Sequence, residues 1–171
     1  MMKKFLFFGF VLCLPVILCF SAAYNSFGQD TFLAGRMLVA VPNMRDPYFK
    51  HAVVYMVQHD ANGALGLIIN RKMGVGSLAE MLAELGRRTD NDRQIDLYLG
   101  GPVSLRKVFV LHSDDFSAEA TLTSPAGISM TGDISVIDAI AEGHEPRRMR
   151  FMMGYAGWAA GQLEQEIDRG D

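Results

Sequence analysis

The chain has 171 residues, a length that suits one domain. It carries 16 lysines and arginines against 19 aspartates and glutamates, and its net charge of −3 becomes −5 once two lysines near the N-terminus are set aside. Because phosphate backbones attract basic surfaces, an acidic domain of this kind is a poor candidate for direct binding of nucleic acid.

The first 23 residues have the pattern of a signal peptide. Lys3 and Lys4 give a positive start, and a run of 16 mostly apolar residues follows. Ser21 and Ala23 then occupy the −3 and −1 positions of a cleavage site. The alternatives are an uncleaved anchor and a start codon assigned too far upstream.

Cleavage there leaves a mature chain from Tyr24, with residues 24–31 as a short linker and residues 32–171 as a single domain. The apolar run is shorter than the ~20 residues that a spanning helix needs, so we expect no membrane span in the mature chain. The protein is then exported to the periplasm, whereas a misassigned start makes it cytoplasmic. Both cysteines, Cys13 and Cys19, lie in the leader, which excludes a disulfide or thiolate site from the mature chain.

Two strands joined by a tight turn are the clearest local prediction. Residues 34–41 form a first strand, which Pro42 ends. Residues 51–59 are apolar on both faces, which predicts a central strand buried on both sides. The turn 60–63, Asp-Ala-Asn-Gly, tolerates positive φ and leads to a partner strand over 64–71.

A helix is predicted over residues 77–86. Ser77 is its cap, Glu80 completes a capping box, and Gly86 ends it. The helix carries one apolar stripe, formed by Leu78, Met81, Leu82 and Leu85.

The second half of the chain adds strands and two more helices. Strands are predicted over residues 95–101, 107–113, 127–132 and 147–158, the last of them broken by its glycines. A helix over 133–143 begins at the cap Asp133 and ends at Gly143. A last helix over 159–170 places Leu163 and Ile167 on one face. The order predicts an α+β fold, a mostly antiparallel sheet with about three flanking helices.

The stretch GGPVSLRKVFVLHSDD, residues 100–115, poses the choice between a phosphate loop and a turn. A phosphate loop needs glycines directly before a helix, but Gly100 and Gly101 precede a strand, and Pro102 removes a donor. We therefore interpret the glycines as a tight turn that lets two strands pack closely.

His112 ends the strand after that turn. Neighbours on a strand point to opposite faces, so His112 and Ser113 are not partners in a catalytic triad. His51 and His59 lie at opposite ends of one predicted strand, ~24 Å apart, which is too far for a shared metal ion. We predict no metal site, no cofactor and no assigned catalytic residue.

The loop PNMRDPYF is the best candidate for binding. Asn43, Arg45 and Asp46 are polar groups held between two prolines near strand ends, where binding sites tend to lie. If the loops converge, they form a ligand-binding cleft from Asn43, Asp46, Asn70, Gly100, Gly101 and His112. The plainer interpretation, which we favour, is that Asn43 and Asp46 satisfy backbone groups of the turn.

Two further features are interpreted as structural and not as parts of a binding site. Arg147, Arg148 and Arg150 form the main basic cluster, and we interpret it as a solvated face. Trp158, the single tryptophan, is expected to anchor the core or its rim.

Three blocks in order, FLAGRMLVAVPNMRDPYFKHAVVYMVQHDANGALGLIINR, LYLGGPVSLRKVFVLHS and GYAGWAAGQLEQEI, resemble the YqgE/AlgH family (UPF0301) of uncharacterised bacterial proteins over residues 32–171. The resemblance implies a small cytosolic domain with a coiled, branched β-sheet flanked by helices, and it brings no catalytic residues. One branch is named as a regulator of alginate biosynthesis genes. Relative to the family pattern, this chain has an added leader and lacks a C-terminal tail.

Two functional hypotheses follow. The favoured one is a non-enzymatic binding or regulatory module for an unknown small molecule or protein partner, acting without direct reading of DNA. The alternative is a hydrolase or transferase that uses His112 with a loop carboxylate such as Asp46. A component of a larger assembly, marked by a large apolar surface patch, is a third possibility.

Overall fold

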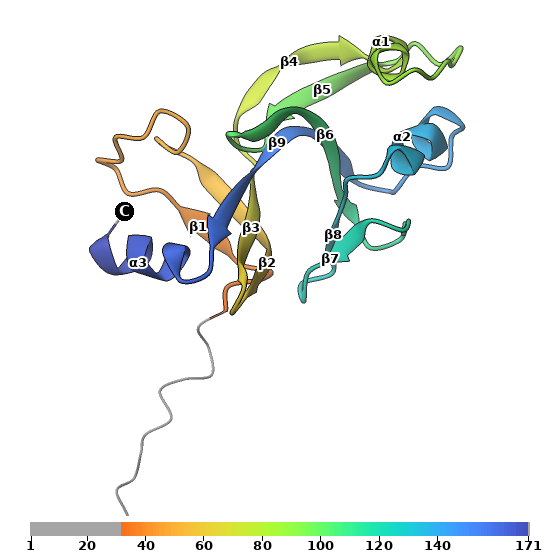
Figure 1. The fold of residues 1–171 in the computed structure, drawn as a ribbon. Helices are drawn as coiled ribbons and strands as arrows, with labels where there is room; N and C mark the ends of the chain where they lie inside the picture. The colour runs from red at the N-terminus through yellow and green to blue at the C-terminus, as the bar shows by residue number, and fades with distance from the viewer. Residues whose placement is uncertain (1–31, 171) are drawn as a thin grey trace, which may run out of the picture.

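The structure is a computed structural model that describes residues 32–170. The predicted leader and linker lie outside the described residues. Over the described part, groups of strands and single helices alternate as predicted, with four strands before the first helix and one helix last (Figure 1).

The strands are β1 (Met37–Val39), β2 (Val53–Asp60), β3 (Gly63–Ile68), β4 (Lys72–Ser77), β5 (Gln94–Leu99), β6 (Val103–Ser113), β7 (Thr121–Thr123), β8 (Ile128–Thr131) and β9 (Met149–Ala159). The helices are α1 (Leu78–Glu84), α2 (Ile134–Ala141) and α3 (Gln162–Arg169).

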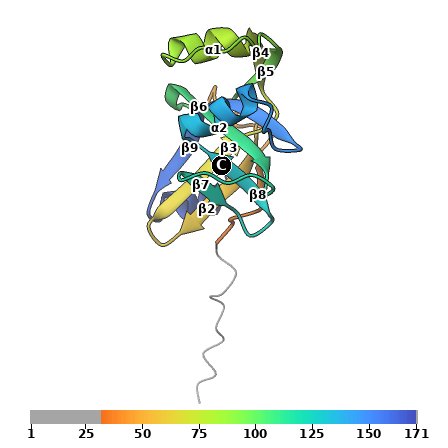
Figure 2. The ribbon, with the colours of Figure 1, turned by 90° about the vertical axis from the view of Figure 1, so that its right-hand side faces the viewer.

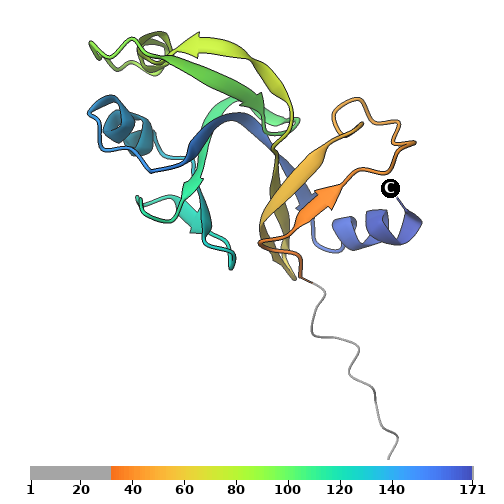
Figure 3. The same cartoon turned by 180° about the vertical axis from the view of Figure 1, so that it is seen from behind.

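One curled sheet contains these strands in the order β1-β2-β3-β9-β6-β8-β7, and β4 and β5 form an arm beside β9. Every pairing is antiparallel except that of β5 with β9. The sheet curves into a half-barrel, with β1 to β3 on one side and β7 and β8 on the other (Figures 1 and 3). The fold is therefore α+β and mostly antiparallel, as predicted.

β9 is the strand that joins the two halves of the sheet. Its first part pairs with β5 and β6, and its last part, from Ala156, pairs with β3. Gly154, at φ 68°, marks the change of partner. A Cβ there would lie 2.6 Å from the carbonyl oxygen of Gly101, so only glycine fits. The predicted break at a glycine is thus a bend inside one continuous strand.

Three apolar clusters hold the layers together. α1 and α2 pack on one face of β6 and β9 through buried residues such as Leu82, Ile140 and Phe151 (Figure 2). The concave face holds a second cluster around Tyr55 and Met152. The third lies under α3 and consists of Ala52, Val54, Met56, Ile68 and Leu163.

The local predictions with clear turn or cap chemistry are confirmed. β2 and β3 form the predicted hairpin, in which Asp60 pairs with Gly63. Ser77 Oγ accepts the Glu80 N–H at the start of α1, and the Asp133 side chain accepts the Ser135 N–H at the start of α2.

Other local predictions were wrong. β5 and β6 do not pair with each other across the Gly-Gly-Pro segment, because each pairs with β9 instead. β4 and β7 were missed, since glycines in one and short length in the other hide the strand pattern. His51 precedes β2 at φ 58° and is not part of the strand. Ile167 is 46% exposed, whereas Leu163 on the same helix is buried.

Candidate functional site

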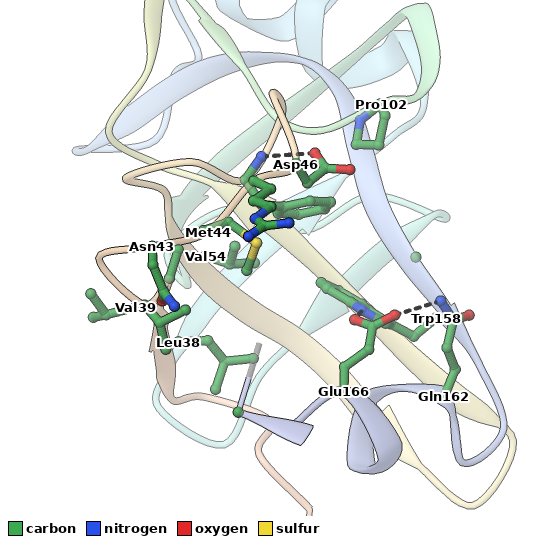
Figure 4. Close-up of a pocket in the computed structure, with 16 residues that line it drawn as sticks. Leu38, Val39, Asn43, Met44, Asp46, Val54, Pro102, Trp158, Gln162 and Glu166 are labelled. Carbon is green, nitrogen blue, oxygen red and sulfur yellow. Dashed lines mark hydrogen bonds between the residues drawn. The ribbon is translucent and has the colours of Figure 1, made fainter. Parts of the chain in front are cut away.

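A cleft of about 710 Å³ lies between β1, the loop that follows it, and α3 (Figure 4). Its floor is apolar and includes Leu38 and Val54. Four consecutive residues, 38–41, line it, so the cleft runs along the outer strand of the sheet.

The wall formed by the loop is held by an aspartate. Asp46 Oδ1 accepts the backbone N–H groups of Tyr48 at 2.7 Å and Phe49 at 3.2 Å. This is the turn role that we favoured for Asp46 from the sequence. The loop therefore has a defined shape that presents Asn43 and Met44 beside the cleft (Figure 4).

The opposite wall is α3, which is fixed at both of its faces. Leu163 is 3% exposed and packs under the sheet in the third apolar cluster. Glu166 accepts the Trp158 indole N–H at 2.8 Å and the Gln162 side-chain N–H at 2.9 Å, so it ties the helix to β9 (Figure 4). The centroid of the Trp158 ring lies 6.1 Å from that of the Phe49 ring, and both residues line the cleft.

Two polar side chains of the cleft have no internal partner. Among residues 32–170, no hydrogen bond or ion pair involves the side chain of Asn43 or of Arg45. The carboxylates nearby are at least partly engaged, Asp46 by backbone amides and Glu166 by Trp158 and Gln162. The free donors of the cleft are therefore Asn43 and Arg45.

The remaining predicted site residues do not converge with Asn43 and Asp46. Asn70 accepts the Val53 N–H and donates to the His51 carbonyl, both at 2.9 Å, so its side chain joins two strand ends. This is a backbone-satisfying role of the kind that asparagine often has in loops.

Gly100 and Gly101 are packing residues in the structure. A Cβ on Gly100 would lie 2.2 Å from the Gly154 carbonyl oxygen, and one on Gly101 would lie 2.2 Å from the Tyr155 carbonyl carbon. The predicted close approach is real, but the partner is β9. Only the next residue, Pro102, lines the cleft.

His112 is buried, 2% exposed, in a different part of the fold. Its Nδ1 lies 2.7 Å from the Ser113 carbonyl oxygen, so that nitrogen carries the hydrogen. Its Nε2 then accepts from the Thr131 hydroxyl at 2.8 Å. His112 lines a cavity that contains neither Asn43 nor Asp46, and both ring nitrogens are engaged.

Sequence reasoning missed two features that involve α3. His59 is 5% exposed, accepts the Leu33 N–H at 3.0 Å and contacts Glu164 on α3 at 2.9 Å. Glu166 and Trp158 come from the far end of the chain, and no local pattern predicts that they meet the loop.

Neither a metal centre nor a membrane helix is found in the described part of the chain. No group of three or more histidine, cysteine, aspartate or glutamate residues within 32–170 is arranged to hold a metal ion. In the same range, each helix is too short or too polar to cross a bilayer.

A protein-family model described as AlgH-like matches residues 37–171. The chain belongs to the AlgH-like family. The resemblance seen in the sequence is thereby confirmed.

Two relatives show how far the similarity extends along the chain. A UPF0301 protein of Methylococcus capsulatus is 47% identical over 138 residues, which cover 81% of this chain and 76% of that protein. A UPF0301 protein of Pseudomonas entomophila is 42% identical and covers 80% and 73%.

Solved structures agree with the fold. The solution structure of the AlgH protein from Pseudomonas aeruginosa is 40% identical, with a TM-score of 0.71 over 84% of this chain and 76% of that one. A Corynebacterium diphtheriae protein with 23% identity and a TM-score of 0.60, covering 86% and 78%, shares the fold alone.

Proposed function

We propose that this AlgH-like protein is a non-enzymatic binding module that takes an extended, apolar peptide segment of a protein partner along β1. The observation that carries the proposal is that one edge of β1, which none of the described strands pairs with, borders the cleft between the loop and α3. A regulatory output then depends on the bound partner and not on direct reading of DNA.

The first support is the pairing of β1. Among the described strands it pairs with β2 alone. The Arg36 carbonyl accepts the Met56 N–H and the Ala40 N–H donates to Ala52, so even-numbered positions face β2. The main-chain groups of Met37 and Val39 therefore point away from the sheet, where an added strand finds its partners.

The second support is exposure of apolar surface at the same edge. The side chains of Met37 and Val39 are 59% and 71% exposed, on the face opposite to Leu38. An exposed apolar edge strand is a template for pairing with another chain. A bound segment with alternating side chains would cover Met37 and Val39 on one face and place its other side chains over the cleft.

The third support is the chemistry of the two free side chains. The Asn43 amide carries both donors and an acceptor, which matches a peptide group, and Arg45 offers donors to carbonyl oxygens. Asp46 and Glu166 in the same cleft disfavour a ligand with a strong negative charge. A neutral peptide main chain fits this set better than a free carboxylate does.

The geometry of His112 gives no support to the hydrolase or transferase alternative. That reaction needs an imidazole nitrogen free to exchange a proton with substrate. Both nitrogens of His112 are engaged by Ser113 and Thr131, and Asp46 lies at another cavity.

A peptide titration tests the proposal. The probe is a pool of acetylated, amidated hexapeptides with threonine at alternate positions and valine, leucine, isoleucine or phenylalanine at the others. Trp158, the single tryptophan, lines the cleft and reports binding by fluorescence, and amide shifts of residues 37–41 place it. The control pool is N-methylated at alternate residues, so that it keeps the side chains but loses the donors of a strand ladder.

Val39→Pro is the decisive variant, because proline is tolerated on an edge strand whose N–H faces solvent. We expect the Val39→Pro protein to fold normally but no longer to bind the peptides. We expect Asn43→Ala to weaken peptide binding about tenfold. Equal binding of the methylated pool, binding to Val39→Pro, or no response to the pool at millimolar concentration overturns the proposal. A dimer that Val39→Pro dissociates identifies a second copy as the occupant and overturns it too.

A further inference from the structure

Two arginines of the basic cluster, Arg148 and Arg150, lie on the concave face of the sheet. Neither lines the proposed peptide cleft. β6 and β9 pair Leu111 with Arg150, and the Ser113 N–H donates to the Arg148 carbonyl. Residues two apart on a strand share a face, so both arginines lie on the same face as Leu111 and Ser113.

Two cavities meet at this place. One, of about 340 Å³, is lined by Arg148 and Arg150 together with the apolar residues Leu111 and Ile128. The other, of about 410 Å³, is lined by Ser113, Arg147 and Arg148. Arg148 and Ser113 line both of them, so Arg148 borders two neighbouring cavities.

Arg150 is held in place before any ligand arrives. Its Nη1 donates to the Ile69 carbonyl at 2.6 Å, and its guanidinium carbon lies 4.8 Å from the centre of the Tyr98 ring. A planar guanidinium fixed in this way still has free N–H groups, and it loses little conformational entropy on binding.

The side chain of Arg148 is unpaired within the described residues. No hydrogen bond or ion pair involves its side chain among residues 32–170. Its neighbour Arg147 donates from Nε to Asp115 at 2.7 Å, and Ser113 donates to the other oxygen of the same carboxylate. These bonds, that from Ser113 foremost, hold the pKa of Asp115 far below its usual range, so Asp115 and Arg147 satisfy each other.

We propose that Arg148 and Arg150 form a binding site for a small phosphate monoester whose organic part contacts Leu111 and Ile128. Arg148 directly precedes β9 and Arg150 lies in it, so their Cα atoms are ~7 Å apart, and their long side chains can converge on one phosphoryl group. A phosphate monoester carries a charge of about −2 and three acceptor oxygens, so it can accept from both guanidinium groups at once. The apolar floor distinguishes such an ester from inorganic phosphate. The Asp114 carboxylate, near Gly127, lowers the affinity for any anion, so binding depends on the two guanidinium groups.

The test uses the full chain and three probes: phenyl phosphate, inorganic phosphate and benzoate. Binding is measured by calorimetry at low ionic strength and by NMR of the arginine Nε–Hε groups. We expect phenyl phosphate to bind more tightly than the other two and to shift the Arg148 and Arg150 signals. Arg148→Gln should raise the dissociation constant for phenyl phosphate at least about tenfold. Arg148→Lys keeps the charge but not the forked guanidinium, so its dissociation constant should lie between those of the parent protein and Arg148→Gln.

Arg106→Gln is the matched control, because Arg106 is also exposed and has no internal partner within 32–170. It should leave the dissociation constant unchanged. Equal effects of Arg148→Gln and Arg106→Gln overturn the site as non-specific attraction of anions. Equal affinity for phenyl phosphate and benzoate, or no heat and no shift with any probe, overturns it as well. Arg148 has no side-chain hydrogen bond or ion pair within residues 32–170 to lose, so a melting temperature equal to that of the parent protein will show that the variant folds.

Discussion

Truncation of Leu163 is the sharpest test of how the cleft is built. α3 has eight residues, too few to be a stable helix alone, so its place depends on its packing. Leu163 is its single buried residue and packs in the cluster with Val54, Met56 and Ile68. Replacement by alanine removes most of that contact and leaves a cavity.

The expected cost can be derived from the burial. Leucine-to-alanine changes at fully buried sites lower the free energy of unfolding by about 2–5 kcal/mol, and Leu163 at 3% exposure belongs to that class. Ile167, one turn later on the same helix, is 46% exposed. Its change to alanine should cost less than about 1 kcal/mol, because much of its side chain is already in water.

Urea unfolding followed by Trp158 fluorescence measures both variants. Trp158 donates to Glu166 on α3, so its emission reports the docking of the helix as well as global unfolding. Leu163→Ala should strongly lower the urea concentration at the midpoint of unfolding. If α3 undocks first, an additional transition appears at lower urea concentration. A cost for Leu163→Ala no greater than that for Ile167→Ala would show that α3 is not anchored as described.

Three further predictions concern other parts of the fold. Gly100→Ala should prevent folding or lower stability severely, because its Cβ would lie 2.2 Å from the Gly154 carbonyl oxygen. Gly74→Ala is the control, since a Cβ there meets nothing within 4 Å. Equal melting temperatures of the two variants would contradict the close packing of β9. His59→Ala should lower the free energy of unfolding by about 2–4 kcal/mol, since it leaves the Leu33 N–H without its acceptor and opens a cavity, while the exposed His144→Ala should be neutral in the same urea assay. Because hydrogen bonds from Ser113 and Arg147 depress the pKa of Asp115 in the folded state, its contribution to stability is present above the unfolded value of ~3.9 and is lost only as pH falls through the lower folded value. A carboxyl carbon titration by NMR should therefore give Asp115 a midpoint below 3.9 that rises in Arg147→Gln; an ordinary midpoint would refute the contact.

The parts of the fold that follow from neighbours in sequence could be predicted. The hairpin of β2 and β3 needs only a turn that tolerates positive φ, and the starts of α1 and α2 need only a capping side chain. Asp46 likewise bonds to amides two and three residues away. In each case, the partner atoms lie within a few residues of the side chain that selects them.

The assembly of the cleft could not be predicted in the same way. The loop residue Asn43 shares a cleft with Glu166 and Trp158 only because β9 pairs with β3 and α3 then packs against the same part of the sheet. The predicted grouping of His112 with that loop failed for the same reason, since the curl of the sheet carries β6 away from it.

The sequence by itself determined the family, the α+β class, the order of elements and the chemistry of the local caps and turns, because these depend on short-range patterns. Only the tertiary structure decided that Gly100 and Gly101 pack against β9, that β1 is the outermost strand of the described sheet beside a cleft, and that Arg148 and Arg150 share a concave face. Those facts depend on which distant strands pair, and pairing is settled by the burial of apolar faces over the whole sheet.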